Sequence, residues 1–123
     1  MDAKELMIGD YIRLPFFDRN AKVIRVGESL IDTNIITPVR MDEIEPIPLT
    51  PEILEKNEFE CYSRESNLIW GITLPEGHFV LAYMDYYWEF TVDATIYRRI
   101  KIQYVHQLQH LLKLCKIEKE IEL

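Results

Sequence analysis

The chain has 123 residues, of which 48% are hydrophobic and 28% charged, and it contains seven tyrosines, five phenylalanines and two tryptophans. This composition is typical of a globular protein and excludes a disordered chain, which would be poorer in aromatic residues. Acidic residues outnumber basic ones by 21 to 14, which gives a net charge of −7. Because non-specific nucleic-acid binding requires phosphates to be neutralised, this charge argues against nucleic acid as a partner.

The cysteines and the first residues bear on the cellular compartment. Cys61 and Cys115 lie far apart and match no metal-binding spacing. A disulfide between them is one alternative. Two cysteines in a chain with this much apolar sequence fit better as buried thiols in a reducing compartment. Residues 1–5 lack the basic and apolar pattern of a secretory signal, and no apolar segment is long enough to span a bilayer. We therefore expect a cytoplasmic protein without membrane association.

Residues 5–45 alternate short β-like runs with polar turns. The run at residues 5–8 leads into the turn signal Gly9-Asp10, and residues 11–14 and 22–26 form two further β-like runs. Pro38 limits the next apolar stretch to an edge strand or a strand end, because proline cannot donate to a sheet ladder. Several short strands with closely spaced turns predict a small, strongly bent sheet or half-barrel.

A short helix is predicted to start at Thr50. Thr50 is a suitable N-cap, and Pro51 at the first helical position loses nothing by lacking an N–H. Leu49 and Leu54 have the spacing of a hydrophobic staple. We expect two or three turns that end near Asn57 and connect two sheet regions.

The remaining residues, 59–123, predict a run of strands closed by a helix. Residues 74–77 are typical of a hairpin loop. From residue 79 to 93 the even positions are apolar or aromatic, whereas the odd positions beyond Leu81 are tyrosine, threonine or acidic. This alternation predicts a sheet whose even positions are buried and whose odd positions are solvated, with a bend or turn near Asp85. A weak turn at residues 93–95 and a strand at residues 96–102 follow.

After residue 103 the apolar period changes from two to 3.6. The stripe formed by Val105, Leu108, Leu111, Leu112 and Cys115 predicts an amphipathic helix from residue 104 to about residue 116, packed on the sheet's apolar face. The tail, residues 117–123, alternates again and fits either an edge strand or a fraying helix end. The expected fold class is α+β: a small N-terminal sheet or half-barrel, a short capped helix, and an antiparallel sheet with a C-terminal helix on one face. We expect one domain, residues 1–123, with a possible subdivision into residues 1–45 and 46–123.

Three sequence islands carry a resemblance to other proteins. They are Glu5-Leu6-x-Ile8-Gly9-Asp10, Ile47-Pro48-Leu49-Thr50 and Tyr104-Val105-His106-Gln107-Leu108-Gln109. Together they resemble a family of short proteins from Bacteroides-type gut bacteria and their phages or mobile elements. In that family the last island is usually followed by Asn-Leu and aromatics, whereas this chain has His110 and Leu112-Lys113 there. The resemblance implies a fold and an origin but no activity.

The residues Tyr83, Asp85, Tyr87 and Glu89 are the best candidates for a binding site. If they share the solvated face of one strand, the two tyrosines offer a large contact area at low entropy cost, and their hydroxyls can orient a partner. The alternative is that another part of the chain covers this face. Asp85 and Glu89 lie two pleats apart, too far to share a proton in a straight strand, so an acid–base pair is not favoured.

His106 and His110 are candidates for metal ligands, because residues four apart share one face of a helix. The glutamate between the histidines of a metalloprotease helix is missing, since residue 107 is Gln, and no third ligand is evident. Hydrogen bonding to neighbouring backbone, or solvation beside the apolar stripe, is the preferred interpretation. The sequence predicts no metal and no cofactor.

The residue patterns favour a non-enzymatic protein. The serines lie in no nucleophile elbow, and the four glycines are too scattered for a phosphate loop. The leading hypothesis is an accessory or binding protein, of phage or mobile-element origin, that acts through contact with an unknown protein partner or a second copy of itself. The second is a nucleic-acid-associated factor that uses Arg98, Lys101 and stacking tyrosines. An enzyme with an unfamiliar site is the third.

Overall fold

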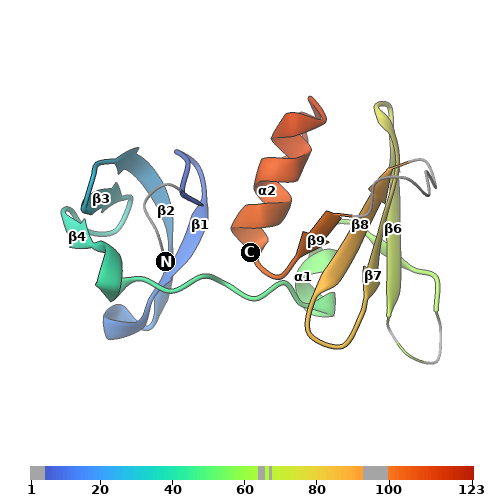
Figure 1. The fold of residues 1–123 in the computed structure, drawn as a ribbon, viewed down its shortest axis with the longest axis horizontal. Helices are drawn as coiled ribbons and strands as arrows, with labels where there is room; N and C mark the ends of the chain where they lie inside the picture. Colours follow the sequence, from blue (N-terminus) through green and yellow to red (C-terminus); the bar gives the residue numbers. More distant parts are fainter. Residues whose placement is uncertain (1–4, 64–65, 67, 93–99) are drawn as a thin grey trace. The chain divides into compact units, whose positions relative to one another are not determined.

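The computed structural model describes residues 5–63, 66, 68–92 and 100–123 (Figure 1). The fold is α+β, with a curled four-stranded half-barrel sheet, a five-stranded antiparallel sheet and a C-terminal helix, as the sequence predicts. The chain forms two compact units, one of residues 1–48 with 104–106 and the other of residues 49–103 with 107–123. Each unit is described by itself below.

The first unit is the half-barrel. Its strands, each antiparallel to the next, lie in the order β1-β2-β3-β4. Their bounds are β1 Tyr11–Leu14, β2 Arg19–Val26, β3 Leu30–Thr33 and β4 Val39–Arg40, with single 3-10 turns at Pro15–Phe17 and Met41–Glu43. The curled sheet encloses a cluster of buried apolar side chains: Leu6, Ile12, Leu14, Ala21, Val23, Ile31, Val39 and Ile44.

The turn at Gly9 and Asp10 fixes the start of the half-barrel. Gly9 has a φ of 95°, a conformation that a side chain would disfavour. Its N–H donates to the Val23 carbonyl at 2.7 Å, and the Val23 N–H donates to the Asp10 carbonyl at 2.9 Å. The buried Asp10 carboxylate accepts a hydrogen bond from the Met7 N–H at 2.8 Å. The turn is therefore confirmed, but residues 5–8 form no strand, because their backbone serves the turn rather than a ladder.

The two edge strands of this sheet are β1 and β4. Pro38 lies directly before the short strand β4, so the expected strand end is confirmed. On β1, Arg13 pairs with Glu45: the Arg13 N–H donates to the Glu45 carbonyl at 2.8 Å, and the Glu45 N–H donates back at 3.0 Å. This bridge occupies hydrogen-bonding groups on an edge strand that would otherwise be open to another chain.

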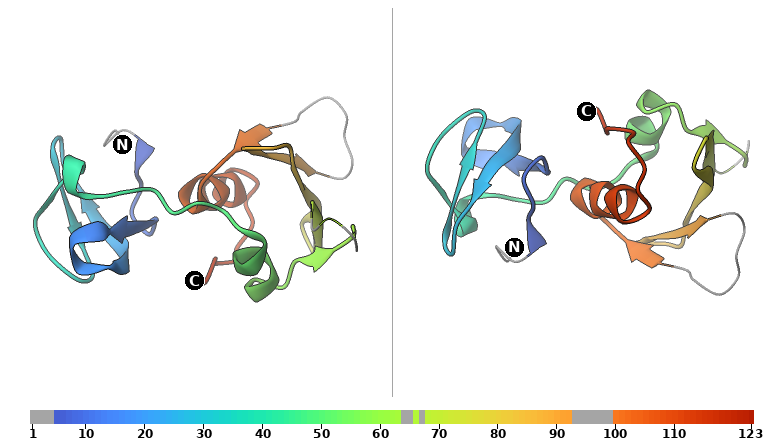
Figure 2. Two further views of the ribbon diagram at one scale, coloured as in Figure 1. Left: turned by 90° about the horizontal axis from the view of Figure 1, so that it is seen from below. Right: turned by 90° about the horizontal axis from the view of Figure 1, so that it is seen from above.

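The second unit contains helix α1 and the five-stranded sheet, with order β5-β6-β7-β8-β9 and antiparallel pairing throughout. Helix α2 lies against the concave side of that sheet in both views of Figure 2. The bounds are α1 Pro51–Lys56, β5 Glu60–Cys61, β6 Ile69–Leu74, β7 Gly77–Tyr83, β8 Trp88–Val92, β9 Ile100–Ile102 and α2 Val105–Leu114. The buried residues of the sheet's inner face are Trp70, Ile72, Phe79, Leu81, Trp88, Phe90 and Ile102.

Helix α1 starts as its capping signals predict. The Thr50 hydroxyl accepts a hydrogen bond from the Ile53 N–H at 3.4 Å, and Pro51 is the first helical residue. Leu49 and Leu54, the expected staple, are both buried. The helix ends at Lys56 with Asn57 as its C-cap, close to the predicted end, although its six residues make it shorter than two turns.

Residues 79–92 of the aromatic run fold as two antiparallel strands, β7 and β8, so a single alternation of buried and solvated positions does not continue through them. Tyr83 pairs with Trp88, so the chain reverses through Met84–Tyr87 close to the predicted turn at Asp85. In an antiparallel hairpin of this register, odd positions of β7 share a face with even positions of β8. Phe79 and Leu81 are therefore buried, and the prediction that even positions are buried throughout is wrong for β7. Residues 93–99, where a turn and most of a strand were expected, lie outside the described residues.

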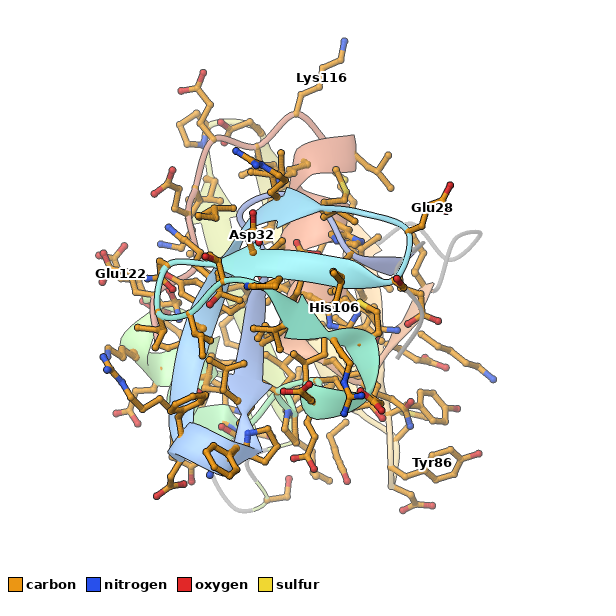
Figure 3. All side chains as sticks on the ribbon, turned by 90° about the vertical axis from the view of Figure 1, so that its left-hand side faces the viewer. Glu28, Asp32, Tyr86, His106, Lys116 and Glu122 are labelled. Atoms are coloured by element: carbon orange, nitrogen blue, oxygen red, sulfur yellow. The ribbon has the colours of Figure 1, made fainter. Side chains whose placement is uncertain are left out.

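Helix α2 ends in a Schellman motif. Lys116 adopts a left-handed φ of 58°, and the Ile117 N–H donates to the Leu112 carbonyl at 2.8 Å. The Lys116 side chain points into solvent (Figure 3). The tail beyond it is neither strand nor helix, which corrects both expectations. It is held by the buried side chains of Ile117 and Ile121 and by Asn57. The Asn57 side-chain amide donates to the Glu122 carbonyl at 2.7 Å, and its oxygen accepts from the Glu122 N–H at 2.7 Å.

Candidate binding surface

The turn that joins β7 and β8 presents a pair of tyrosines. The Met84 N–H donates to the Tyr87 carbonyl at 2.8 Å, which leaves Asp85 and Tyr86 as a two-residue loop. Asp85 has a φ of 90°, at a loop position where glycine is the usual residue. Tyr86 is 73% exposed and projects away from the ribbon (Figure 3), and its ring meets the Tyr87 ring edge-on at 5.1 Å. A large aromatic side chain thus stands at a fixed position on the surface.

Strand β9 and the residues after it support this turn. The Lys101 ammonium lies 4.8 Å from the centroid of the Tyr87 ring, within the range of a cation–π interaction. The Gln103 side-chain amide donates to the Tyr86 carbonyl at 3.2 Å. The Gln107 side chain accepts from the Gln103 N–H at 2.7 Å and so holds the segment between β9 and α2. The two tyrosines are therefore contacted by Lys101 on β9 and by Gln103 directly after it.

Two hollows adjoin the turn. One has a volume of about 230 Å³ and is lined by aromatic, amide and ammonium groups, from Tyr86, Tyr87, Lys101, Ile102, Gln103 and Gln107. The other has a volume of about 430 Å³ and is lined by Leu68, Tyr83, Met84 and Asp85. Leu68 and Met84 are 44% and 42% exposed, so the second hollow has apolar walls beside the Asp85 carboxylate. We call the turn Met84–Tyr87 and these two hollows the tyrosine-turn surface.

The structure separates the four residues that the sequence grouped together. Tyr83 lies on the same face of the sheet as Trp88, and the centroids of their rings are 5.0 Å apart. Glu89 points to the opposite face of the sheet, where Lys101 of β9 is its neighbour in the strand register. Asp85 and Tyr87 belong to the turn itself. The prediction that all four share one solvated face is therefore wrong, and the reason is the change of face at the hairpin.

The residues of the nucleic-acid hypothesis are only partly described. Lys101 lies on Tyr87, so one basic side chain and one tyrosine of that hypothesis are contiguous. Arg98 lies outside the described residues. Tyr86, which the alternation assigned to a buried face, is 73% exposed, and only the position of the turn could have revealed this.

The two histidines of helix α2 differ in their surroundings. His106 is 2% exposed, and its ring stacks on that of Tyr104 at 5.9 Å with an interplanar angle of 8°. His110 is half-buried. Within the described parts of the chain, no group of three or more histidine, cysteine or carboxylate side chains is placed to hold a metal ion. Both cysteines are free thiols.

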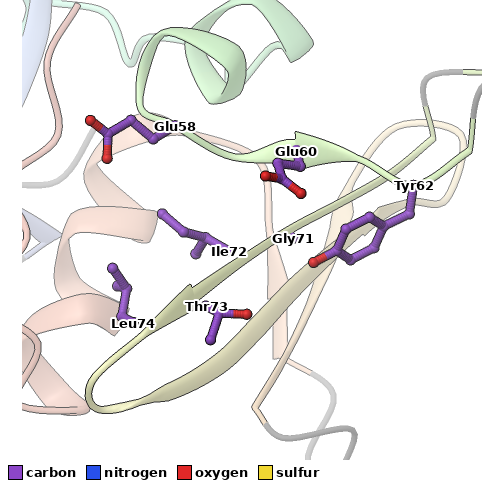
Figure 4. A pocket seen from close by; sticks show the side chains of 7 residues that line it. All are labelled: Glu58, Glu60, Tyr62, Gly71, Ile72, Thr73 and Leu74. Carbon is purple, nitrogen blue, oxygen red and sulfur yellow. The ribbon is translucent and has the colours of Figure 1, made fainter.

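A further hollow of about 340 Å³ lies where β5 ends beside β6 (Figure 4). Glu58, Glu60 and Thr73 contribute polar groups to its lining. The Tyr62 ring lies over Gly71 and stacks on His78 at 5.9 Å. The Tyr62 ring fills the space that a side chain at residue 71 would occupy, so packing alone accounts for the position of the ring.

Comparison with known proteins finds no match: no family model, no curated protein and no solved structure is similar to this chain. The resemblance to the proteins of Bacteroides-type bacteria and their phages thus remains a prediction. No helix in the described part of the chain is long and apolar enough to cross a membrane.

Proposed function

We propose that this protein is a non-enzymatic binding protein that acts through protein–protein contact, and that its contact site is the tyrosine-turn surface. The observation that carries the proposal is the exposed Tyr86 beside Tyr87, held by Lys101 and Gln103. Tyrosine supplies a large, rigid contact area with a polar end, and it is enriched at interface positions that contribute most binding energy. Because the turn is already held in place, little conformational entropy is lost on binding.

We further propose that the protein comes from a phage or mobile element and acts in the cytoplasm. The three sequence islands suggest an accessory protein of a phage or mobile element. The two free thiols, Cys61 and Cys115, fit a reducing compartment such as the cytoplasm.

Single-stranded nucleic acid is the second candidate partner. The observation that favours it is the ammonium of Lys101 beside two tyrosines, since bases stack on aromatic rings and phosphates pair with lysine. Glu89 lies directly across the strand pair from Lys101, and its carboxylate would repel phosphates. For this reason we prefer a protein partner.

Photo-crosslinking tests the proposal and separates the two partners. A photoreactive phenylalanine analogue replaces Tyr86, and in a control protein it replaces Leu114, which is 79% exposed on helix α2. Both proteins are irradiated in cells that naturally produce the chain. We expect a protein adduct of defined mass from position 86 that is absent from position 114. The same adduct should be lost when Tyr87→Ser is added, because Tyr87 supports the Tyr86 ring.

The other outcomes are equally informative. An adduct with RNA or DNA from position 86 would favour the second candidate. Equal adducts from positions 86 and 114 would show that exposure alone causes the crosslinks, and this would contradict a specific surface. The same conclusion would follow if neither position gave an adduct.

A further inference from the structure

The first unit carries an aromatic tip between β1 and β2. Phe16 is 89% exposed, and Phe17, 42% exposed, meets the Phe16 ring edge-on at 5.2 Å. A fully solvated phenylalanine is costly, because it leaves about 150–250 Å² of aromatic surface in water. We call this turn, Pro15–Phe17, the phenylalanine tip.

A backbone hydrogen bond and an ion pair close the phenylalanine tip at its base. Pro15 opens a single 3-10 turn, which Asp18 closes with a φ of 50° and a hydrogen bond from its N–H to the Pro15 carbonyl at 3.1 Å. The Arg13 guanidinium pairs with the Asp18 carboxylate across the base of the turn. Arg19 follows at the start of β2 and is exposed. The tip thus offers an aromatic ring with a positive charge close to it in sequence.

The apolar hollow of the tyrosine-turn surface has the opposite properties. Leu68, Tyr83 and Met84 supply apolar walls, and Asp85 places a carboxylate at its margin. Its volume of about 430 Å³ lies in the lower part of the range of about 300–1,000 Å³ that is usual for ligand pockets, and one phenyl ring requires only part of it. The occupant that fits this chemistry is an exposed aromatic side chain accompanied by a basic residue.

We propose that this occupant is Phe16 of a second copy of the chain, with Arg19 of that copy near Asp85. The inference rests on the proposed function, because it names the partner of the same surface. Two observations support a second copy. The chain presents both an exposed aromatic side chain and a hollow with apolar walls. Arg13 pairs with the exposed Asp18 of the tip, which leaves Arg19 as the charge opposite to that of Asp85. Such a contact joins different surfaces of the two copies, and it forms a two-fold dimer when it is made reciprocally or a larger ring or open chain when it is not.

The expected affinity is low, because one aromatic anchor buries far less than the roughly 800 Å² per partner of a standard interface. We expect dissociation constants on the order of 0.1 mM. In sedimentation equilibrium the mean mass of the wild type should rise above 14.7 kDa with concentration. Phe16→Ser and Met84→Lys should each remain monomeric.

Mixing the two variants gives the sharpest test. Phe16→Ser retains an intact hollow, and Met84→Lys retains an intact tip, so an equimolar mixture can form one junction only. We expect the mixture to reach the dimer mass and go no further. Arg19→Glu should weaken the association of the wild type by roughly fivefold, the upper range for an exposed ion pair. Ile24→Ser is the matched control, since Ile24 is 50% exposed on β2 outside the tip, and it should leave the association unchanged.

Several results would overturn the inference. They are a wild type that stays monomeric to about 1 mM, association that survives Phe16→Ser, or a mixture of the two variants that does not associate. If Met84→Lys lost its circular dichroism signal, Leu68→Lys would replace it, because Leu68 lines the same hollow. A monomeric wild type that still gives a specific heterologous protein adduct from position 86 would refute self-association and leave the proposed function standing.

Discussion

The Tyr62 ring packs against Gly71 in space that a side chain at residue 71 would fill. A Cβ atom built on Gly71 would lie 2.3 Å from the Tyr62 ring, far inside van der Waals contact. The ring also stacks on His78, whose Nδ1 lies 2.9 Å from the Thr73 hydroxyl. A methyl group at residue 71 would therefore displace the Tyr62 ring from its stacking on His78.

We predict that Gly71→Ala lowers the free energy of unfolding by about 1 kcal/mol or more, as overpacking usually does. In a Tyr62→Ser background the same substitution should cost much less, because the clashing ring is gone. Urea unfolding of the wild type, the two single variants and the double variant gives the coupling energy between the two sites. A coupling energy near zero would show that the ring does not constrain residue 71.

Lys116 occupies a position that favours glycine. It adopts the left-handed conformation that ends helix α2, and this costs a residue with a side chain about 1 kcal/mol relative to glycine. Lys116→Gly should therefore raise the free energy of unfolding by about that amount. Lys113→Gly, three residues earlier inside the helix, should lower it by about 1 kcal/mol. Chemical denaturation measures both, and a destabilising Lys116→Gly would contradict the strain at this cap.

At the scale of elements, the parts with local chemical signals could be predicted from the sequence. Thr50 and Pro51 mark the start of α1 because capping involves only neighbouring residues. The hairpin between β6 and β7 was also predictable, since Gly77, with a φ of 149°, follows a Pro-Glu turn. The turn at Asp85 was located only approximately, because no glycine marks its positive φ, and the assignment of faces along β7 failed for that reason.

The C-terminal tail could be predicted only in part. Its alternating pattern corresponds to the burial of Ile117 and Ile121, but the side-chain hydrogen bonds that hold it come from a residue distant in sequence. Asn57 is 3% exposed and donates to the Ile53 carbonyl at 2.8 Å in addition to its two hydrogen bonds with Glu122. It therefore ends helix α1 and fixes the tail at the same time. Neither period-two nor period-3.6 patterns carry information about such a side-chain contact.

Asn57→Ala should release the tail. Removal of the amide leaves the Glu122 N–H and two carbonyls without this partner, which should lower the free energy of unfolding by about 1–3 kcal/mol. Hydrogen exchange of the Glu122 amide, followed by NMR, should accelerate in the variant more than exchange in β7. Glu122→Gln is the control, because Asn57 contacts only the backbone of Glu122, and it should leave both quantities unchanged. Unchanged protection of Glu122 in Asn57→Ala would show that the tail is held by other contacts.

At the scale of the whole molecule, the candidate site was half predictable. The sequence drew attention to the aromatic run and therefore to Tyr87, and Lys101 was singled out for its charge. Tyr86 was missed because its exposure depends on the loop position within the hairpin. The phenylalanine tip at Phe16 was not identified from the sequence, because only the tertiary structure shows that its side chain is exposed.

The affinity for single-stranded DNA distinguishes a nucleic-acid partner from a protein partner. With a net charge of −7, the chain should bind a fluorescent oligothymidine more weakly than about 0.1 mM at physiological salt, the weak end of non-specific binding. Lys101→Ala removes the ammonium beside Tyr87 and should change nothing measurable, whereas it would abolish micromolar binding if the tyrosines stacked on bases. Fluorescence anisotropy at several salt concentrations measures this. Affinity in the micromolar range that falls steeply with salt and requires Lys101 would contradict the protein partner and make the tyrosine-turn surface a nucleic-acid site.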